Sequence, residues 1–188
     1  MKAVTISPHN DDAVLFAAFP TICYRADVVT VLRSQVQEDR GSGITASERE
    51  REDVEALDEL DALTIEQWSF LDSRPEWEAV AAQISLLAER YDVAIAPWPE
   101  EGGHDQHNMV GEIVGRHFAT NDVIWYTTYT RHSGRTRGGG GFAEFDAHPA
   151  WIAAKHRALA CYATQIREPT CRPWFLDDLR EYTRHGPA

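Results

Sequence analysis

Short apolar runs alternate with longer amphipathic stretches along most of this chain. The apolar runs are rich in β-branched residues and short enough for buried strands, at residues 2–6, 27–32, 64–70, 92–96 and 122–126. The stretches between them have the apolar spacing of helices, at residues 13–23, 48–62, 76–90 and 106–118. Thr45 or Ser47 can cap the second of these helices. The alternation predicts an α/β, Rossmann-like fold with a mostly parallel sheet of about five or six strands flanked by helices.

Two later stretches break the alternation. Residues 131–141 read RHSGRTRGGGG, and four consecutive glycines exclude a rigid element there. This stretch is either a plain surface loop or a mobile lid over a site. Residues 149–183 are expected to form C-terminal helices that pack through Trp151, Tyr162 and Trp174. Because no linker or internal repeat is visible, residues 1–188 are expected to be a single domain.

The composition of the chain limits the classes of partner that the protein is expected to bind. The 188 residues include 18 Lys and Arg against 30 Asp and Glu, which gives a net charge of −12. A field of this sign repels phosphate backbones and anionic membranes, so binding to nucleic acid or membranes is not expected. No stretch reaches the roughly 18–20 apolar residues of a membrane span, and no signal peptide is evident. Three scattered cysteines fit free thiols in a reducing cytoplasm, which is the expected location.

Side chains that can carry chemistry gather after the first and fourth predicted strands. The first cluster is SPHNDD at 7–12, and the second is GGHDQH at 102–107. Because the carboxyl ends of parallel strands meet at one edge of a sheet, the two clusters can come together there. They offer two imidazoles and one carboxylate for a metal with open positions, and leave a further carboxylate and imidazole for catalysis.

Other readings of these clusters stay open. Two histidines three residues apart are a weak metal signal, and an Asp pair after a strand is often only a helix N-cap. The motifs of other common sites are absent: no GxGxxG follows a strand, and there is no GxxxxGK[ST], HExxH or GxSxG. Dinucleotide, P-loop, zincin and serine-hydrolase chemistry are therefore not supported.

The two motifs together are similar to those of the PIG-L / LmbE-like deacetylase family. That family usually carries His-Pro-Asp-Asp-Glu and, later, His-Pro-Asp-His. The resemblance extends to the charged helix and to the C-terminal pattern, at residues 48–61, 155, 158–159 and 162–165. This chain departs from the family where Asn10 replaces proline, Ala13 replaces glutamate, and Asp105-Gln106 replaces Pro-Asp.

The resemblance implies a metal-dependent hydrolase that removes an acetyl group from an N-acetylated amino sugar or a related small-molecule amide. It implies that His9, Asp12 and His107 bind Zn²⁺, with Fe²⁺ as the alternative ion. Asp11 would be the general base that takes a proton from the metal-bound water. His104 would stabilise the oxyanion or help to protonate the leaving amine.

Substrate contacts are expected on the same rim of the sheet. Arg33, Gln35 and Arg40 follow the second strand and can bind sugar hydroxyls or an anion, and Trp98 can stack on a sugar face or pack in the core. Three alternatives remain. They are a non-catalytic sugar-binding protein on the same scaffold, a deacetylase acting on a polymer- or nucleoside-linked amino sugar, and iron redox chemistry at the same ligands.

Overall fold

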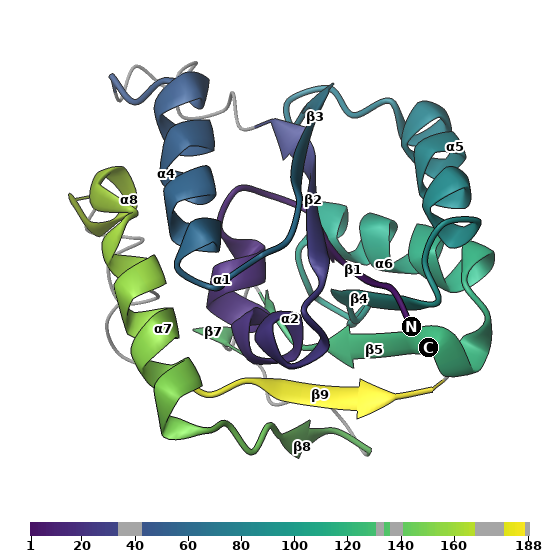
Figure 1. Cartoon of the computed structure of the whole chain (residues 1–188). Coiled ribbons are helices and arrows are strands. Elements are labelled where there is room, and N and C mark those ends of the chain that lie inside the picture. The colour runs from purple at the N-terminus through teal and green to yellow at the C-terminus, as the bar shows by residue number, and fades with distance from the viewer. Residues whose placement is uncertain (34–42, 131–133, 136–140, 168–178, 187–188) are drawn as a thin grey trace.

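A mixed sheet of seven strands forms the centre of the computed structural model, which describes residues 1–33, 43–130, 134–135, 141–167 and 179–186 (Figure 1). Five strands run parallel in the spatial order β3-β2-β1-β4-β5: Ile65–Leu71, Asp27–Arg33, Ala3–Ser7, Val93–Pro97 and Val123–Tyr126. Strand β9 (Tyr182–His185) pairs antiparallel with β5, and β8 (Ala143–Glu144) pairs antiparallel with β9, which extends the sheet beyond β5. The predicted α/β class and mostly parallel sheet are confirmed, with this antiparallel pairing added at one edge.

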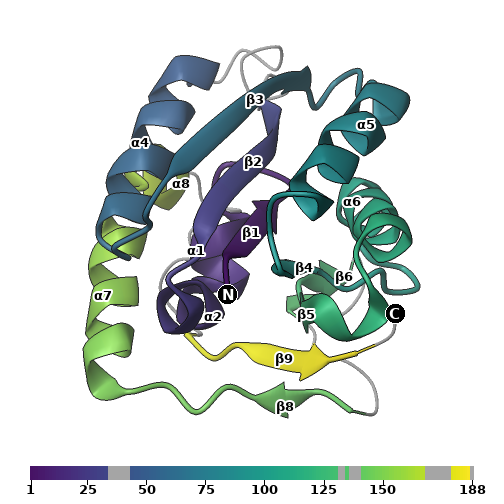
Figure 2. The ribbon, with the colours of Figure 1, turned by 45° about the vertical axis from the view of Figure 1, so that its right-hand side comes forward.

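Helices cover both faces of the sheet (Figure 2). One face packs against α1 (Asp12–Phe16), α2 (Ala18–Tyr24), α4 (Ala46–Asp58) and α7 (Pro149–Ala160). The other packs against α5 (Trp77–Ala88) and α6 (Asp105–His117). Strands β1 and β5 are buried along their whole length. This explains why β5 is apolar throughout and why β1 carries no charged residue, because a parallel strand covered on both faces has no side that faces solvent.

The first predicted helix is broken in two. Residues 13–23 form α1 and α2, separated at Ala17, whose backbone is not helical. Pro20 lies in the first turn of α2, where its missing N–H costs no hydrogen bond. The carboxylate of Glu181 accepts hydrogen bonds from the N–H groups of Ala18 and Phe19, both at 3.0 Å, and so caps the second helix.

Two local features fix the other helices that matter for the site. Thr45 caps α4 in a reciprocal capping box with Glu48, which confirms one of the two predicted caps. Gly111 lets α6 lie against the end of β4, because a Cβ at this position would overlap the carbonyl oxygen of Pro97. The close approach sets the position of the first turn of α6 relative to the strand.

The C-terminal prediction is partly wrong. α7 and α8 (Ala163–Arg167) confirm helices in the first half of residues 149–183, and residues 168–178, including Trp174, lie outside the described part. Tyr182 and Thr183 do not belong to a helix but begin strand β9. Pairing with β5 holds this segment in a strand conformation. The hydrogen bond from Trp125 Nε1 to the carbonyl of Gly186 at 2.5 Å also holds it there.

Most of the glycine-rich stretch 131–141 lies outside the described residues, so the choice between surface loop and lid stays open. Its described part contributes β7 (Gly134–Arg135), which pairs with β6 (Tyr129–Thr130). A short 3₁₀ helix (Thr120–Asp122) precedes β5. Among the described residues, no helix combines the length and apolar character needed to cross a membrane.

Candidate metal centre

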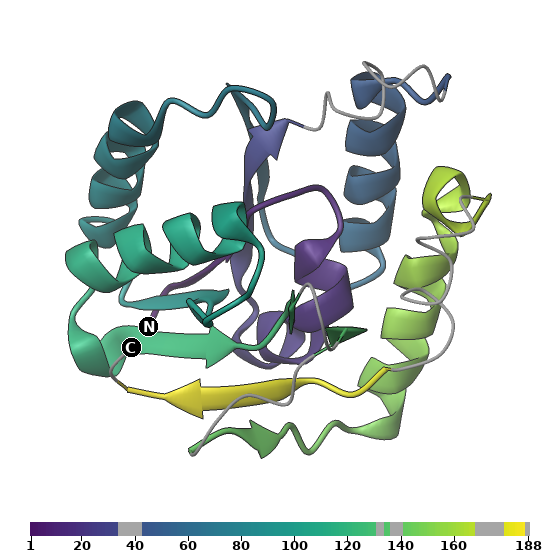
Figure 3. The same cartoon turned by 180° about the vertical axis from the view of Figure 1, so that it is seen from behind.

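The two predicted clusters meet at the carboxyl ends of β1 and β4. These strands are neighbours in the sheet, and the order of strands along the chain reverses between them. The chain leaves β1 toward one face and β4 toward the other, which opens the position where parallel α/β folds bind ligands. Figure 3 shows the segment after β1 passing beside the end of α6.

Three side-chain atoms form a nearly equilateral triangle at this point. His9 Nδ1, Asp12 Oδ2 and His107 Nε2 lie 3.1 Å from one another. Atoms that each bind one zinc ion at about 2.0–2.1 Å stand about 3 Å apart, so the triangle has the size of a ligand set. Both His107 and Asp12 are buried, and His9 is 14% exposed at its side chain.

Protons connect these three atoms only one pair at a time. If both ring nitrogens carry a proton toward Asp12, two N–H groups oppose each other across the 3.1 Å between the rings. If only one ring nitrogen carries a proton, that N–H points either to the carboxylate or to the other ring. A cation between the three atoms can bind the lone pairs of all three at once. The residues therefore fit a divalent metal ion.

Local structure explains why Asp12 and His107 point inward. Asp12 is the first residue of α1, and its Oδ2 also accepts a hydrogen bond from the backbone N–H of His9 at 2.9 Å. His107 lies in the first turn of α6. Burial by itself would raise the pKa of Asp12, but the charges and hydrogen bonds of His107 and His9 hold that pKa well below its usual range. Asp12 is thus ready to bind a cation as a carboxylate.

His104 lies beside the triangle and caps α6. Its Nδ1 accepts a hydrogen bond from the N–H of Gln106 at 3.3 Å, and its ring centroid is 4.8 Å from that of His107. Burial, together with the neighbouring His107 and His9, lowers the pKa of His104 to about 4. His9, His104 and His107 also offer nitrogens within 4.8 Å of one another, a looser set than the triangle with Asp12.

Asp11 does not cap the helix that follows it. Its Oδ2 instead accepts a hydrogen bond from the guanidinium of Arg49 on α4 at 2.9 Å. Burial raises the pKa of Asp11, and the positive charge of Arg49 opposes that change. Sequence reasoning missed Arg49 because its partner is 38 residues away, although it lies in the charged helix that carries part of the family resemblance.

Gln106, which sequence reasoning noted only as a departure from the family, contacts His9 directly. Its Oε1 lies 2.7 Å from His9 Nε2, and its Nε2 donates to the carbonyl of Asp72 at 2.5 Å. Asp105, the other departure, is exposed. Of these two residues, Gln106 is therefore the one whose side chain contacts the His9 ring.

The ring of Tyr129, at the start of β6, lies beside His107 and His104, and no local sequence pattern indicated this contact. Its ring is T-shaped against His107 at 5.3 Å between centroids and lies 6.0 Å from His104. His107 Nδ1 is buried with no hydrogen-bond partner in the part of the chain that the structure describes. Contacts between rings therefore contribute to the orientation of His107.

The residues expected to contact the substrate have different environments in the structure. Arg33, at the end of β2, forms an ion pair with Glu50 at 2.6 Å, while Gln35 and Arg40 lie outside the described residues. Trp98 is half-buried just after β4, and the guanidinium of Arg184 lies 3.8 Å from its ring centroid. A sugar stacking on that face of Trp98 would have to displace Arg184.

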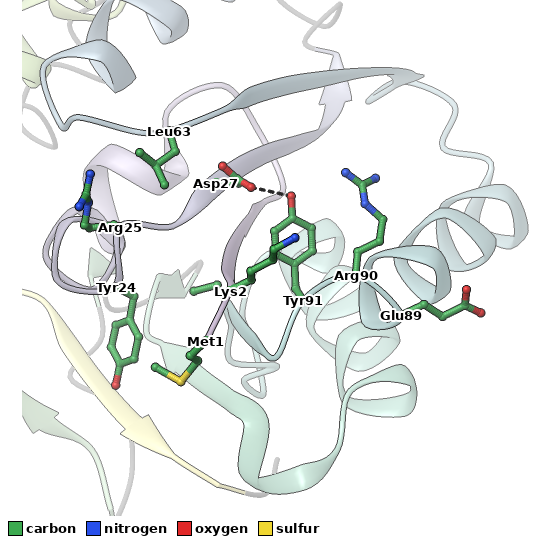
Figure 4. A pocket seen from close by; sticks show the side chains of 10 residues that line it. Met1, Lys2, Tyr24, Arg25, Asp27, Leu63, Glu89, Arg90 and Tyr91 are labelled. Carbon is green, nitrogen blue, oxygen red and sulfur yellow. Dashed lines mark hydrogen bonds between the residues drawn. The ribbon is translucent and has the colours of Figure 1, made fainter.

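A cavity of about 760 Å³ lies at the end of the strands opposite the metal centre, near the amino ends of β1 and β2 (Figure 4). Lys2, Arg25 and Tyr91 line it, and the Tyr91 hydroxyl donates to Asp27 at 2.7 Å. None of the predicted site residues that the structure describes lines this cavity. It is therefore separate from the metal centre.

Comparison with solved structures gives the same fold in several proteins. The deacetylase Dbv21, which acts on the A40926 pseudoaglycone, matches with a TM-score of 0.71 at 18% identity, over 98% of this chain and 96% of that chain. The 4-carboxy-2-hydroxymuconate hydratase GalB from Pseudomonas putida matches with a TM-score of 0.72 at 12% identity, over 98% and 95%. The N,N'-diacetylchitobiose deacetylase from Pyrococcus horikoshii matches with a TM-score of 0.65 at 15% identity, over 93% and 75%.

The sequence itself identifies the family. No curated protein matches the chain by sequence. The profile of the PIG-L family, described as GlcNAc-PI de-N-acetylase, matches residues 4–118, which include both clusters and α4. This match covers more than half of the chain, and the resemblance seen in the motifs is thereby confirmed. The chain therefore belongs to the PIG-L family.

Proposed function

We propose that this protein is a metal-dependent N-deacetylase that removes the acetyl group of an N-acetylated amino sugar or a related small-molecule amide. The triangle of His9 Nδ1, Asp12 Oδ2 and His107 Nε2 carries the proposal, because its atoms converge at the spacing of a ligand set. Zn²⁺ is the preferred ion, and Fe²⁺ suits the same two imidazoles and one carboxylate. The family match supports deacetylation as the reaction.

The residues around the triangle have distinct parts in this reaction. A zinc ion held by His9, Asp12 and His107 would supply Lewis acidity, which would lower the pKa of water to about 7 and polarise the acyl oxygen. Asp11, which has no place in the triangle, takes the proton from the attacking water as the carbon–oxygen bond forms. The same proton then passes to the amide nitrogen as the carbon–nitrogen bond breaks. Acetate and a free amine leave, and Asp11 returns to its charged form.

His104 acts as a neutral hydrogen-bond donor. Its Nδ1 accepts from the N–H of Gln106, so in the neutral ring the proton is on Nε2. A pKa of about 4 keeps the ring neutral at physiological pH. Such a group stabilises the developing oxyanion but does not supply a proton from an imidazolium. Of the two roles expected for His104, this supports oxyanion stabilisation.

Two alternatives set the limits of the proposal. A sugar-binding protein without catalysis has no use for a carboxylate held beside the metal ligands, so Asp11 argues against it. The fold alone does not choose the reaction, because a hydratase shares it at a similar TM-score. Among substrates, a small amino sugar fits the deacetylases of a pseudoaglycone and of diacetylchitobiose. The net charge of −12 disfavours a polyanionic polymer.

The test combines metal analysis with acetate release from a panel of N-acetylated amino sugars, for the wild type and for Asp11→Asn. We expect about one zinc per chain in both proteins. Acetate release should fall roughly 10²- to 10⁴-fold in the variant, the usual contribution of a general base. Loss of metal from Asp11→Asn would exchange the roles of Asp11 and Asp12. No acetate release by metal-loaded wild type from any member of the panel would overturn the proposal.

A further inference from the structure

We propose that Gln106 is a positioning residue that fixes the tautomer and ring orientation of His9, so that His9 presents Nδ1 to the metal. The inference rests on the proposed metal centre. It concerns a residue at which this chain departs from the usual family motif, because a neutral amide stands in the place of an aspartate.

The orientation of the Gln106 amide follows from its second partner. The carbonyl of Asp72 can only accept a hydrogen bond, and it lies 2.5 Å from one end of the amide. That end must therefore be the NH₂ group. The other end, 2.7 Å from His9 Nε2, must be the oxygen, so the assignment does not depend on a choice between two similar atoms.

An acceptor at this distance requires the proton of His9 to be on Nε2. In a neutral imidazole the other nitrogen, Nδ1, then carries a lone pair. Nδ1 is the atom that faces Asp12 Oδ2 and His107 Nε2 at 3.1 Å. Gln106 thus selects the one neutral tautomer of His9 that can bind an ion in the triangle.

The backbone fixes Gln106 in turn. It lies in the first turn of α6, one residue before the ligand His107, so the same helix supplies a ligand and the support of another ligand. The N–H of Asp72 donates to the carbonyl of Arg33 at 3.1 Å, which ties the end of β3 to the end of β2. A chain of hydrogen bonds therefore runs from His9 through Gln106 and Asp72 to Arg33, where the expected substrate rim begins.

Neutrality distinguishes Gln106 from a carboxylate in the same place. A carboxylate partner raises the basicity of a ligating imidazole and adds a negative charge near the ion. Gln106 orients the ring and adds no charge. Replacing it with glutamate should keep the hydrogen bond to His9 while losing the donor to Asp72, which separates the two links of the chain.

The experiment compares Gln106→Leu and Gln106→Glu with the wild type. The control is Gln67→Leu, because Gln67 Nε2 also donates to a backbone carbonyl, that of Glu50 at 3.1 Å, and to Asp53 at 3.2 Å, but touches no ligand. Zn²⁺ affinity is measured on chelator-stripped protein by competition with a chromogenic chelator. The tautomer of His9 is read from nitrogen-15 NMR of the imidazole rings in the stripped protein, and thermal unfolding reports any general loss of stability.

We expect Gln106→Leu to bind Zn²⁺ roughly 10- to 100-fold more weakly and to lose the single Nε2–H tautomer, as loss of a ligand's partner usually does. Gln106→Glu should keep the tautomer and bind at least as tightly as the wild type. Gln67→Leu should stay within about twofold of the wild-type affinity, even where its unfolding temperature falls.

Three results would overturn the inference. They are an unchanged affinity and tautomer in Gln106→Leu, an affinity in Gln106→Glu as weak as in Gln106→Leu, or an equal loss in the Gln67→Leu control. Failure of the proposed function is a different result, in which the wild type binds no metal at all. In that case the tautomer of His9 in the stripped protein still decides whether Gln106 positions the ring.

Discussion

Two buried polar clusters of this protein differ in how their hydrogen bonds are satisfied. Lys155 and Glu181 are both fully buried, and Lys155 Nζ donates to Glu181 Oε1 and to the carbonyls of Leu15 and Leu179. Glu181 also accepts two backbone N–H groups at the start of α2. In the triangle of His9, Asp12 and His107, by contrast, three atoms that can all act as acceptors converge on one point, and a proton pairs only two of them at a time.

The difference separates a structural cluster from a functional one. A buried charge is tolerated when each of its donors has an acceptor, and the Lys155–Glu181 pair meets that condition while it joins α1, α2, α7 and the segment before β9. A buried group of acceptor atoms that converge on one point is suited to a cation, which can bind all of them at once. Four variants test this distinction.

The largest effect is expected at the metal centre. His107→Ala should lose the bound metal and with it acetate release, because a triangle without one imidazole offers only two ligands. Metal content by elemental analysis and acetate release are the measurements. His117→Ala is the matched control, since this histidine lies exposed at the far end of the same helix. Full metal content in His107→Ala would remove His107 from the ligand set.

The structural cluster should respond in stability rather than in metal binding. Lys155→Met keeps the length of the side chain but leaves Glu181 buried without its cation, which typically costs about 3–5 kcal/mol of unfolding free energy. Urea denaturation measures the loss, and the Zn²⁺ affinity of the folded variant should not change. Lys155→Met with Glu181→Gln should recover part of the stability, because the neutral amide still accepts an N–H of α2. A weakened Zn²⁺ affinity in Lys155→Met would mean that the two clusters are coupled.

A third buried acid lies between these two cases. Asp53 of α4 is buried and accepts hydrogen bonds from four donors, which are Tyr162 Oη at 2.7 Å, Thr30 Oγ1 at 3.0 Å, Gln67 Nε2 at 3.2 Å and Asn10 Nδ2 at 3.4 Å. Burial nevertheless raises its pKa from 3.8 to about 6, although the hydrogen bonds of Tyr162, Thr30 and Gln67 oppose that change.

Because folding raises the pKa of Asp53, the folded state holds this proton more tightly than the unfolded state. The contribution of Asp53 to stability is therefore fully present below about pH 4 and is lost as the pH rises through about 6. Asp53→Asn lacks this dependence. The difference in unfolding free energy between the wild type and Asp53→Asn, both stripped of metal, should shift by about 2 kcal/mol against the wild type between pH 4 and 7. A difference that stays constant over this range would show that the four donors keep Asp53 ionised.

The smallest effect is expected at an exposed cap that belongs to neither cluster. Thr45→Ala removes the capping box of α4 and should cost about 1 kcal/mol in unfolding free energy, measured by urea denaturation. Arg49, one turn further along the helix, should still reach Asp11, so acetate release should change little. A large loss of activity in Thr45→Ala would mean that the end of α4 positions Asp11 more tightly than its exposed cap suggests.

Much of the fold and part of the site could be predicted from the sequence alone. The apolar runs predicted the five parallel strands within about one residue at each end. The four inner strands are largely buried, which favours apolar residues along them, whereas the edge strand β3 is mostly exposed or half-buried and has polar residues. Thr45 and Ser47 were the two predicted caps of α4, and the structure selects Thr45, which forms a capping box with Glu48. The two motifs placed imidazoles and carboxylates at the ends of β1 and β4, where parallel topology brings them together.

Only the tertiary structure decided the partners of those residues. Arg49 meets Asp11 across 38 positions, and Gln106 meets His9 across 97. No local spacing encodes such contacts, since they depend on how α4 and α6 pack against opposite faces of the sheet. The strand at Tyr182–His185 is a case of the same kind, because a short polar segment becomes a strand only when β5 offers an unpaired edge. The sequence determined which chemistry the chain carries, and packing determined which atoms face one another.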